Sequence, residues 1–212
     1  MGQAVTITSM EIAAFDAAGA WERALAAMPS WRREKVERLR GEQARRLSLA
    51  VGMLLDEALQ GVGRRLATTE VVFGEQGKPR FREAGLFRFS ATHSGTTAML
   101  ATCAGEVGMD FEAFGRRARA RGDALLKRIA GDEEVAFVRA GGGEEEREVR
   151  FLRLWTAKEA YLKWLGAGLT VDPREVVVEL GEGMAARVAG HPVVRLGVEV
   201  LAQGVRAVCT GR

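Results

Sequence analysis

Two runs of predicted elements, each with helices followed by short strands, succeed one another along this chain of 212 residues. In the first run, residues 20–63 place leucine and valine three, four and eight positions apart, which is an apolar spacing typical of helices. Ser30, directly after Pro29, is the predicted N-cap of a helix over residues 31–40. The strands of this run are predicted from β-branched and apolar segments at residues 5–15, 69–73, 86–90 and 97–102.

The second run follows Gly105 and opens with a predicted strand at residues 107–111. Residues 119–140 are predicted to be helical with a break near Gly131. The segment GGGEEERE (141–148) is a glycine hinge followed by an acidic turn, and acidic residues favour the start of a helix. This long helix should end at the GAGL segment, and the strands predicted after it are residues 176–180, 193–200 and 205–210.

The composition indicates a globular protein, since 47% of the residues are hydrophobic and 28% are charged. It excludes a disordered, collagen-like or disulfide-framework protein. No apolar run approaches the ~20 residues of a membrane helix, and the N-terminus has no secretory signal pattern, so we expect a cytoplasmic protein without a membrane partner. Cys103 and Cys209 lack metal-ligand spacing and are expected to be reduced and buried.

An acidic pair lies in the strand that opens the second run, where Asp110 and Glu112 alternate with Met109 and Phe111. Side chains two positions apart on a strand share a face, so both carboxylates should point the same way. Two convergent carboxylates suit Mg²⁺, which usually keeps waters and binds substrate phosphates. The alternative is an ordinary amphipathic edge strand with two solvated acids.

The long helix carries a polar ridge in the segment WTAKEAYLK, where Trp155, Glu159 and Lys163 recur every four residues. One interpretation is a surface ion pair between Glu159 and Lys163, which would stabilise the helix by only about 0.2–0.5 kcal/mol. The functional interpretation makes Glu159 a third metal ligand or a base, and Lys163 a partner of phosphate.

Two further polar segments contain groups that bind phosphate. Thr92, His93 and Ser94 are predicted to lie in a turn between two strands, and Lys78 lies in the glycine–proline loop GEQGKPR (74–80). Glycine, hydroxyl groups and a nearby cation can together bind a phosphate. The alternative for both segments is an ordinary polar loop.

The four segments follow the order G-x-x-G-K-P, F-x-x-[ST]-H-S-G, V-G-x-D-x-E and W-[TS]-x-K-E-A-Y-x-K-x-x-G-x-G-L. In this order, over about residues 32–169, the chain resembles the 4′-phosphopantetheinyl transferases, and among them the larger, surfactin-synthetase-activating type. The resemblance implies an α+β fold, with layered α/β elements, in two pseudo-symmetric halves, residues 1–104 and 105–212. Each half would be a small antiparallel sheet packed with helices, with coenzyme A in the cleft between them.

The resemblance also implies a role for individual residues. Asp110, Glu112 and Glu159 match the metal-binding acids of the family, and Lys163 matches its lysine near the reacting phosphates. His93 matches a histidine that contacts the 3′-phosphate of coenzyme A. The other expected coenzyme A contacts are Lys78 and Thr92 and, from a looser match of the basic segment RREKVERLRGEQARRLS, Lys35, Arg46 and Ser48.

The implied activity is Mg²⁺-dependent transfer of the 4′-phosphopantetheine group of coenzyme A to a serine of an apo acyl or peptidyl carrier protein, with release of adenosine 3′,5′-bisphosphate. The serine proton would go to Glu159 or to a metal-bound water held by Glu112, and both remain open. The carrier protein could serve fatty-acid, polyketide or nonribosomal-peptide synthesis. We expect the enzyme to be a monomer and to meet the acidic carrier protein with the basic segment 116–121.

Two other functions compete with this one. A non-catalytic nucleic-acid-binding protein would use the arginines clustered in residues 32–46 and 116–121, in a chain with a net charge of +3. Aromatic residues are not interleaved with these arginines and the acidic residues would face the same ligand, so we expect no nucleic-acid partner. A protein that binds coenzyme A without transfer would need to have lost a carboxylate, and none is lost.

Overall fold

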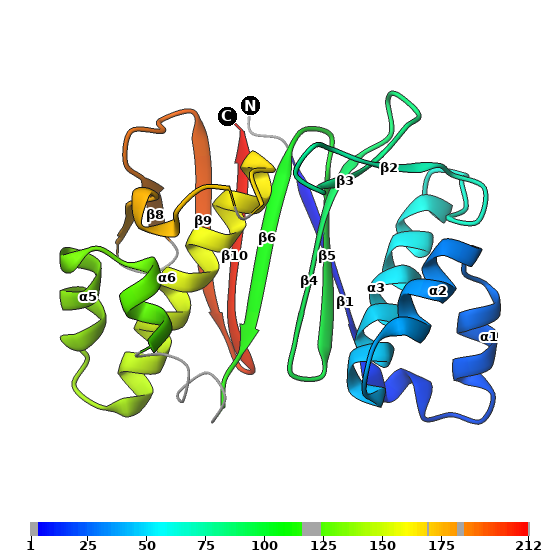
Figure 1. Ribbon diagram of the computed structural model, residues 1–212, viewed down its shortest axis with the longest axis horizontal. Helices are drawn as coiled ribbons and strands as arrows, with labels where there is room; N and C mark the ends of the chain where they lie inside the picture. Colours follow the sequence, from blue (N-terminus) through cyan, green and yellow to red (C-terminus); the bar gives the residue numbers. More distant parts are fainter. Residues whose placement is uncertain (1–3, 116–123, 169, 182–184, 212) are drawn as a thin grey trace.

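The computed structural model describes residues 4–115, 124–168, 170–181 and 185–211. The segment 116–121, which we expect to meet the carrier protein, lies outside these residues. The protein is built from helices and antiparallel sheets, which confirms the α+β class. The two larger sheets lie side by side in the middle of the molecule, and the helices cover them on the two outer sides (Figure 1). None of the helices in the described ranges is long and apolar enough to cross a membrane.

In the first half, one long helix packs on a three-stranded sheet. The sheet has the order β1-β5-β4 and consists of β1 (Val5–Glu11), β4 (Arg88–Ser94) and β5 (Thr97–Cys103). A 3₁₀ turn (Ile12–Phe15), α1 (Ala20–Ala26) and α2 (Ser30–Arg38) precede the long helix α3 (Glu42–Gln60). The leucines of α3 that set the predicted periodicity, Leu47, Leu54, Leu55 and Leu59, are buried against this sheet.

Two sequence-based boundaries in this half were wrong. Ser30 does not cap α2, because the helix begins at Ser30 with Pro29 as the N-cap, and no side chain caps it. The Thr92–Ser94 segment is not a turn either, since β4 continues through Ser94 and pairs Ser94 with Thr97 of β5. Gly95, with a φ of 60°, makes the turn instead, because glycine adopts this left-handed conformation without a steric penalty. The small hairpin β2 (Val71–Phe73) and β3 (Pro79–Phe81) carries the 74–78 loop.

In the second half, a single long helix packs on a five-stranded antiparallel sheet of order β6-β10-β9-β8-β7. The predicted strands are β6 (Val107–Ala113), β7 (Val178–Leu180), β9 (Val194–Leu201) and β10 (Gly204–Gly211), while β8 (Ala185–Val188) was not predicted. Residues 124–129 are helical, and α5 (Asp132–Arg139) and α6 (Glu144–Leu165) follow. As predicted, α6 starts after a glycine with three glutamates in its first turn, and it ends at Gly166, whose φ is 72°.

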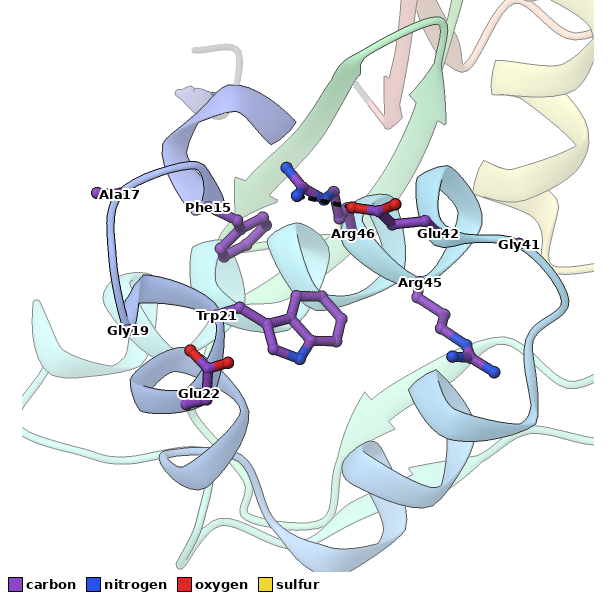
Figure 2. A pocket seen from close by; sticks show the side chains of 9 residues that line it. All are labelled: Phe15, Ala17, Gly19, Trp21, Glu22, Gly41, Glu42, Arg45 and Arg46. Atoms are coloured by element: carbon purple, nitrogen blue, oxygen red, sulfur yellow. Dashed lines mark ion pairs between the residues drawn. The ribbon is translucent and has the colours of Figure 1, made fainter.

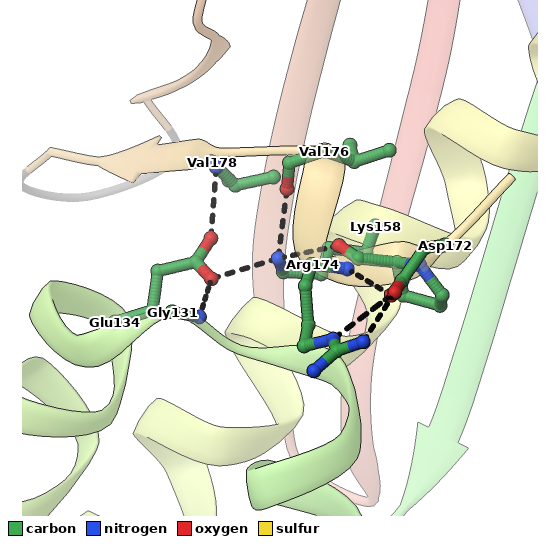
Figure 3. Close-up of polar contacts among 8 residues, drawn as sticks. Gly131, Glu134, Lys158, Asp172, Arg174, Val176 and Val178 are labelled. Atoms are coloured by element: carbon green, nitrogen blue, oxygen red, sulfur yellow. Dashed lines mark hydrogen bonds and ion pairs between the residues drawn. The ribbon is translucent and has the colours of Figure 1, made fainter.

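A buried ion pair fixes the chain that follows α6 (Figure 3). Lys158 is 0% exposed, and its Nζ donates to Glu134 Oε2 at 2.8 Å and to the carbonyl oxygens of Pro173 at 2.9 Å and Val176 at 2.7 Å. Glu134 Oε1 accepts a hydrogen bond from the Val178 amide. All three ammonium hydrogens are therefore satisfied, and these contacts hold Pro173 and Val176 against α6.

A third apolar cluster joins the halves. It contains Met99, Ala101 and Cys103 of β5 and Val107, Met109 and Phe111 of β6, all of them buried. The thiols of Cys103 and Cys209 are both reduced and buried, as predicted. The strands on either side of residues 104–106 therefore pack together, and this cluster is separate from the main core of each half.

Candidate active site

A cavity of about 560 Å³ lies where the two halves meet. From the first half it is lined by α2, α3, β4 and the loop of the β2–β3 hairpin. From the second half it is lined by α6 and by Gly166, Gly168, Val171 and Pro173. The predicted site residues that line it are Lys35, Ser48, Lys78, His93, Glu159 and Lys163. Residues separated by more than 100 positions in the sequence thus line one space.

Arg32 also lines this cavity, and sequence reasoning missed it. Its side chain is only 7% exposed; one nitrogen donates to the Ser48 carbonyl oxygen, and Nε is buried without a hydrogen-bond partner. Burial lowers its pKa to about 10. A guanidinium held in this way favours an anionic ligand. The sequence signal that could have indicated its burial is the helical spacing. Arg32 lies four residues after Met28 and four before Val36, and both of these are buried.

Lys35 and His93 place two more cationic groups beside Arg32. Burial, and then the charge of Arg32, lower the pKa of Lys35. Burial also lowers the pKa of His93, and the charges of Lys163, Arg32 and Lys35 lower it further. These basic groups thus repel one another, and an anion bound in the cavity would relieve the repulsion.

Asp110 lies beside the cavity and is buried, which contradicts the alternative of two solvated acids. Its Oδ1 accepts hydrogen bonds from Thr92 Oγ1 at 3.0 Å and Lys163 Nζ at 2.6 Å, whereas Oδ2 is buried without a partner. Glu112 accepts from Ser94 Oγ at 2.7 Å through Oε2 and from Trp155 Nε1 at 3.2 Å through Oε1. The amine of Lys163 therefore contacts Asp110, which contradicts the alternative of a simple pair with Glu159 on the helix surface.

Three carboxylates influence one another here. Burial, and then the charge of Asp110, raise the pKa of Glu159, and Glu112 adds to the effect. Burial, together with the charge of Asp110, also raises the pKa of Glu112. In the described ranges, no three acidic, histidine or cysteine side chains are spaced as a complete set of metal ligands. The donors nevertheless fit a hard cation, because they are all oxygens and Asp110 Oδ2 is a buried acceptor that lacks a partner.

Three of the residues predicted to contact coenzyme A are engaged elsewhere or lie apart. Lys78 Nζ donates to Glu106 Oε2 at 2.7 Å and to the Trp164 carbonyl oxygen at 2.9 Å. Thr92 is buried against Asp110. Arg46 lines a separate cavity, where Trp21 and Phe15 meet and where it pairs with Glu42 (Figure 2). It also pairs with Asp16. Its assignment as a coenzyme A contact remains a prediction.

The cavity is thus lined by cations of α2 and by Glu159 of α6, and the carboxylates of β6 lie beside it. Residues 106–198 match the family model of the 4′-phosphopantetheinyl transferase superfamily. Over these residues, which make up somewhat less than half of the chain, the protein is similar to this superfamily.

Individual relatives agree with this assignment. The chain is 37% identical to 4′-phosphopantetheinyl transferase AcpT of Salmonella typhimurium over 119 residues, which are 56% of this chain and 57% of that protein. It is 31% identical to 4′-phosphopantetheinyl transferase HetI of Nostoc over 133 residues, 60% of this chain and 54% of that protein. A 4′-phosphopantetheinyl transferase of Bacillus subtilis is 25% identical over 177 residues, 78% of this chain and 77% of that protein. The chain therefore spans little more than half the length of the first of these relatives.

Proposed function

We propose that the protein transfers the 4′-phosphopantetheine group of coenzyme A to a serine hydroxyl of an apo acyl or peptidyl carrier protein and releases adenosine 3′,5′-bisphosphate. The observation that carries this proposal is one cavity that is lined by cationic groups and adjoins a cluster of carboxylates. Arg32, Lys35 and His93 line the cavity and suit an anionic group. Glu159 also lines it, Asp110 lies beside it in contact with Lys163, and these carboxylates suit a cation bound to phosphate oxygens. The match of residues 106–198 to the superfamily model supports the same assignment.

The cationic groups of Arg32, Lys35 and His93 would bind the 3′-phosphate of coenzyme A. Arg32 is held by the Ser48 carbonyl, and within the described ranges no carboxylate pairs with its charge. A bound phosphate would supply that partner and would favour the charged form of His93. Lys35, which is more exposed, would add a contact at the rim of the cavity.

The carboxylates of Asp110, Glu112 and Glu159 would hold Mg²⁺. When bound, Mg²⁺ would neutralise charge that develops on the phosphate oxygens during transfer. Lys163 would contribute a second positive charge from its place beside Asp110. Glu159, which lines the cavity, would accept the proton of the attacking serine.

We also propose that the chain is of the larger type, with both halves in one polypeptide, and that it acts as a cytoplasmic monomer. Each half has its own antiparallel sheet and helices, and β5 ends at Cys103 while β6 begins at Val107, which supports a boundary near residue 105. The cavity draws its walls from both halves of a single chain, so that one copy supplies every side chain named above.

The experiment that tests the proposal is the mass of a carrier protein. The protein is incubated with coenzyme A, Mg²⁺ and an apo carrier protein, and the carrier is weighed by mass spectrometry. We expect an increase equal to one phosphopantetheine group, which EDTA and replacement of the acceptor serine by alanine each abolish. Tight binding of coenzyme A without any mass increase on fatty-acid, polyketide or peptide carriers would instead indicate a binding protein without transfer.

A further inference from the structure

Three hydroxyl groups on β4 form a regular row. Ser90, Thr92 and Ser94 alternate along the strand and therefore share one face. This face meets β6, which belongs to the other sheet, and β4 and β6 are each the edge strand of their own sheet. The row thus lies on the seam between the two halves of the protein, in the middle of Figure 1.

Each hydroxyl accepts a hydrogen bond from a backbone amide of β6, and the amides are two residues apart. Ser90 Oγ accepts from the Met109 amide at 2.9 Å, Thr92 Oγ1 from the Phe111 amide at 3.4 Å, and Ser94 Oγ from the Ala113 amide at 3.1 Å. Unpaired amides on an edge strand need partners when they are buried. The side chains of β4 therefore supply the hydrogen-bond acceptors that the backbone of a neighbouring strand would supply in a continuous sheet.

The three hydroxyl groups differ in the acceptor to which each donates its proton. Thr92 donates to Asp110 Oδ1 at 3.0 Å, and Ser94 donates to Glu112 Oε2 at 2.7 Å. In both cases the hydroxyl bridges a carboxylate on β6 and the amide of the next residue. Ser90 has no carboxylate in this arrangement and contacts only the backbone of Met109.

The consequence is a fixed orientation for two carboxylates. With Oδ1 engaged by Thr92 and Lys163, the buried Oδ2 of Asp110 is left without a partner. Glu112 is held on one oxygen by Ser94 and on the other by Trp155. A side chain held at two points loses little further freedom when it binds a cation.

We propose that Thr92 and Ser94 are positioning residues, which orient Asp110 and Glu112 toward the cation site, and that Thr92 acts through Asp110 rather than by contacting coenzyme A. This inference rests on the proposed function for the identity of the site. A purely structural role for the row predicts that all three hydroxyls are equivalent, because all three join the same two strands.

The test measures Mn²⁺ affinity by electron paramagnetic resonance, with saturating coenzyme A and no carrier protein, so that no turnover occurs. We expect Thr92→Val and Ser94→Ala each to weaken Mn²⁺ binding about tenfold, as is typical when a group that orients a metal ligand is removed. Thr92→Ser should restore the affinity to within about twofold of the original protein, since it keeps the hydroxyl.

Ser90→Ala is the matched control, because it removes a hydroxyl of the same row that touches no carboxylate. It should lower the melting temperature about as much as Ser94→Ala and leave Mn²⁺ affinity unchanged. Coenzyme A affinity measured in EDTA should be the same for Thr92→Val as for the original protein.

Several results would overturn the inference. These are unchanged Mn²⁺ affinity in both Thr92→Val and Ser94→Ala, an equal loss in Ser90→Ala, no Mn²⁺ binding by the original protein, or weaker coenzyme A binding by Thr92→Val in EDTA. The last would assign Thr92 to coenzyme A. If the expected Mn²⁺ pattern appears but no carrier is modified, the proposed function fails and the positioning role stands.

Discussion

Gly108 of β6 lies directly beneath Ala160 of α6, so close that a Cβ on Gly108 would be 2.0 Å from the Ala160 carbonyl oxygen. The same Cβ would be 2.3 Å from the amide nitrogen of Trp164. Only glycine permits this approach of a strand to a helix backbone. The contact sets the depth of α6 on the sheet, and thereby the distance from Lys163 to Asp110.

Replacement of Gly108 by alanine should therefore destabilise the protein by about 3 kcal/mol or more, because both contacting atoms belong to a backbone that cannot rotate away. Coenzyme A binding should fall with it, since α6 would shift relative to β6. Gly197→Ala is the matched control, because Gly197 lies on β9 of the same sheet and a Cβ there would meet nothing within 4 Å. Urea unfolding measures the free energy of unfolding of both variants. Equal stability of Gly108→Ala and Gly197→Ala would show that α6 can shift on the sheet without loss of stability.

Asp110→Asn and Glu159→Gln should each reduce phosphopantetheine transfer at least about 100-fold at saturating Mg²⁺, because each removes a charge from the cation site, and Glu159→Gln also removes the base. Far-ultraviolet circular dichroism should be unchanged. Glu57→Gln, at an exposed position on α3, is the control and should keep full activity. Rates near the original value in either site variant would contradict the three-carboxylate assignment.

Arg32 and Arg46 make a matched pair, since both are arginines of the basic segment but they line different cavities. We expect Arg32→Met to weaken coenzyme A binding about tenfold or more, the loss typical of a charged hydrogen bond. Its melting temperature should not fall, because the variant removes a buried charge with no carboxylate partner. Arg46→Met should leave affinity within about twofold. Isothermal titration calorimetry measures the coenzyme A affinity of both variants. A loss of affinity in Arg46→Met but not in Arg32→Met would show that Arg46, and not Arg32, contacts coenzyme A.

His93 should make coenzyme A binding depend on pH. Its lowered pKa leaves it neutral in the free protein near pH 7, and a bound phosphate would raise that pKa. Binding should then take up a proton, so affinity should increase as the pH falls from about 8 to about 6.5.

Two controls isolate this effect. His93→Ala should remove the His93-dependent part of the slope and weaken coenzyme A by about 1.5–3 kcal/mol. Dephospho-coenzyme A, which lacks the 3′-phosphate, should bind the original protein and the variant about equally. Equal losses for both ligands would assign His93 a structural role only.

The buried pair of Lys158 and Glu134 should contribute strongly to stability, in contrast to an exposed pair. Lys158→Met should lower the free energy of unfolding by about 3–5 kcal/mol, because it leaves the Glu134 carboxylate buried without its cation. The double variant with Glu134→Gln should lose less than the sum of the single variants. Arg38→Met, which breaks the exposed pair with Glu34, should change stability by less than about 1 kcal/mol. Additive losses in the buried pair would contradict direct coupling.

Local rules in the sequence determined much of this protein. The strand period places the side chains of Asp110 and Glu112 on one face of β6, and the glycines and glutamates around residues 141–166 set both ends of α6. The ordered motifs indicated the superfamily whose family model matches residues 106–198. These features depend on neighbours a few positions apart, where backbone geometry and side-chain period leave few choices.

The tertiary structure decided which polar groups meet. The basic segment contains several similar arginines, and only the packing of α2 on α3 shows that Arg32 faces the cavity while Arg46 faces Trp21. Likewise, the continuation of β4 through Thr92 depends on pairing with β5, and its contact with Asp110 depends on how two edge strands of separate sheets meet. Such contacts join residues far apart in the chain, and the packing of whole elements selects them, which no short stretch of sequence specifies.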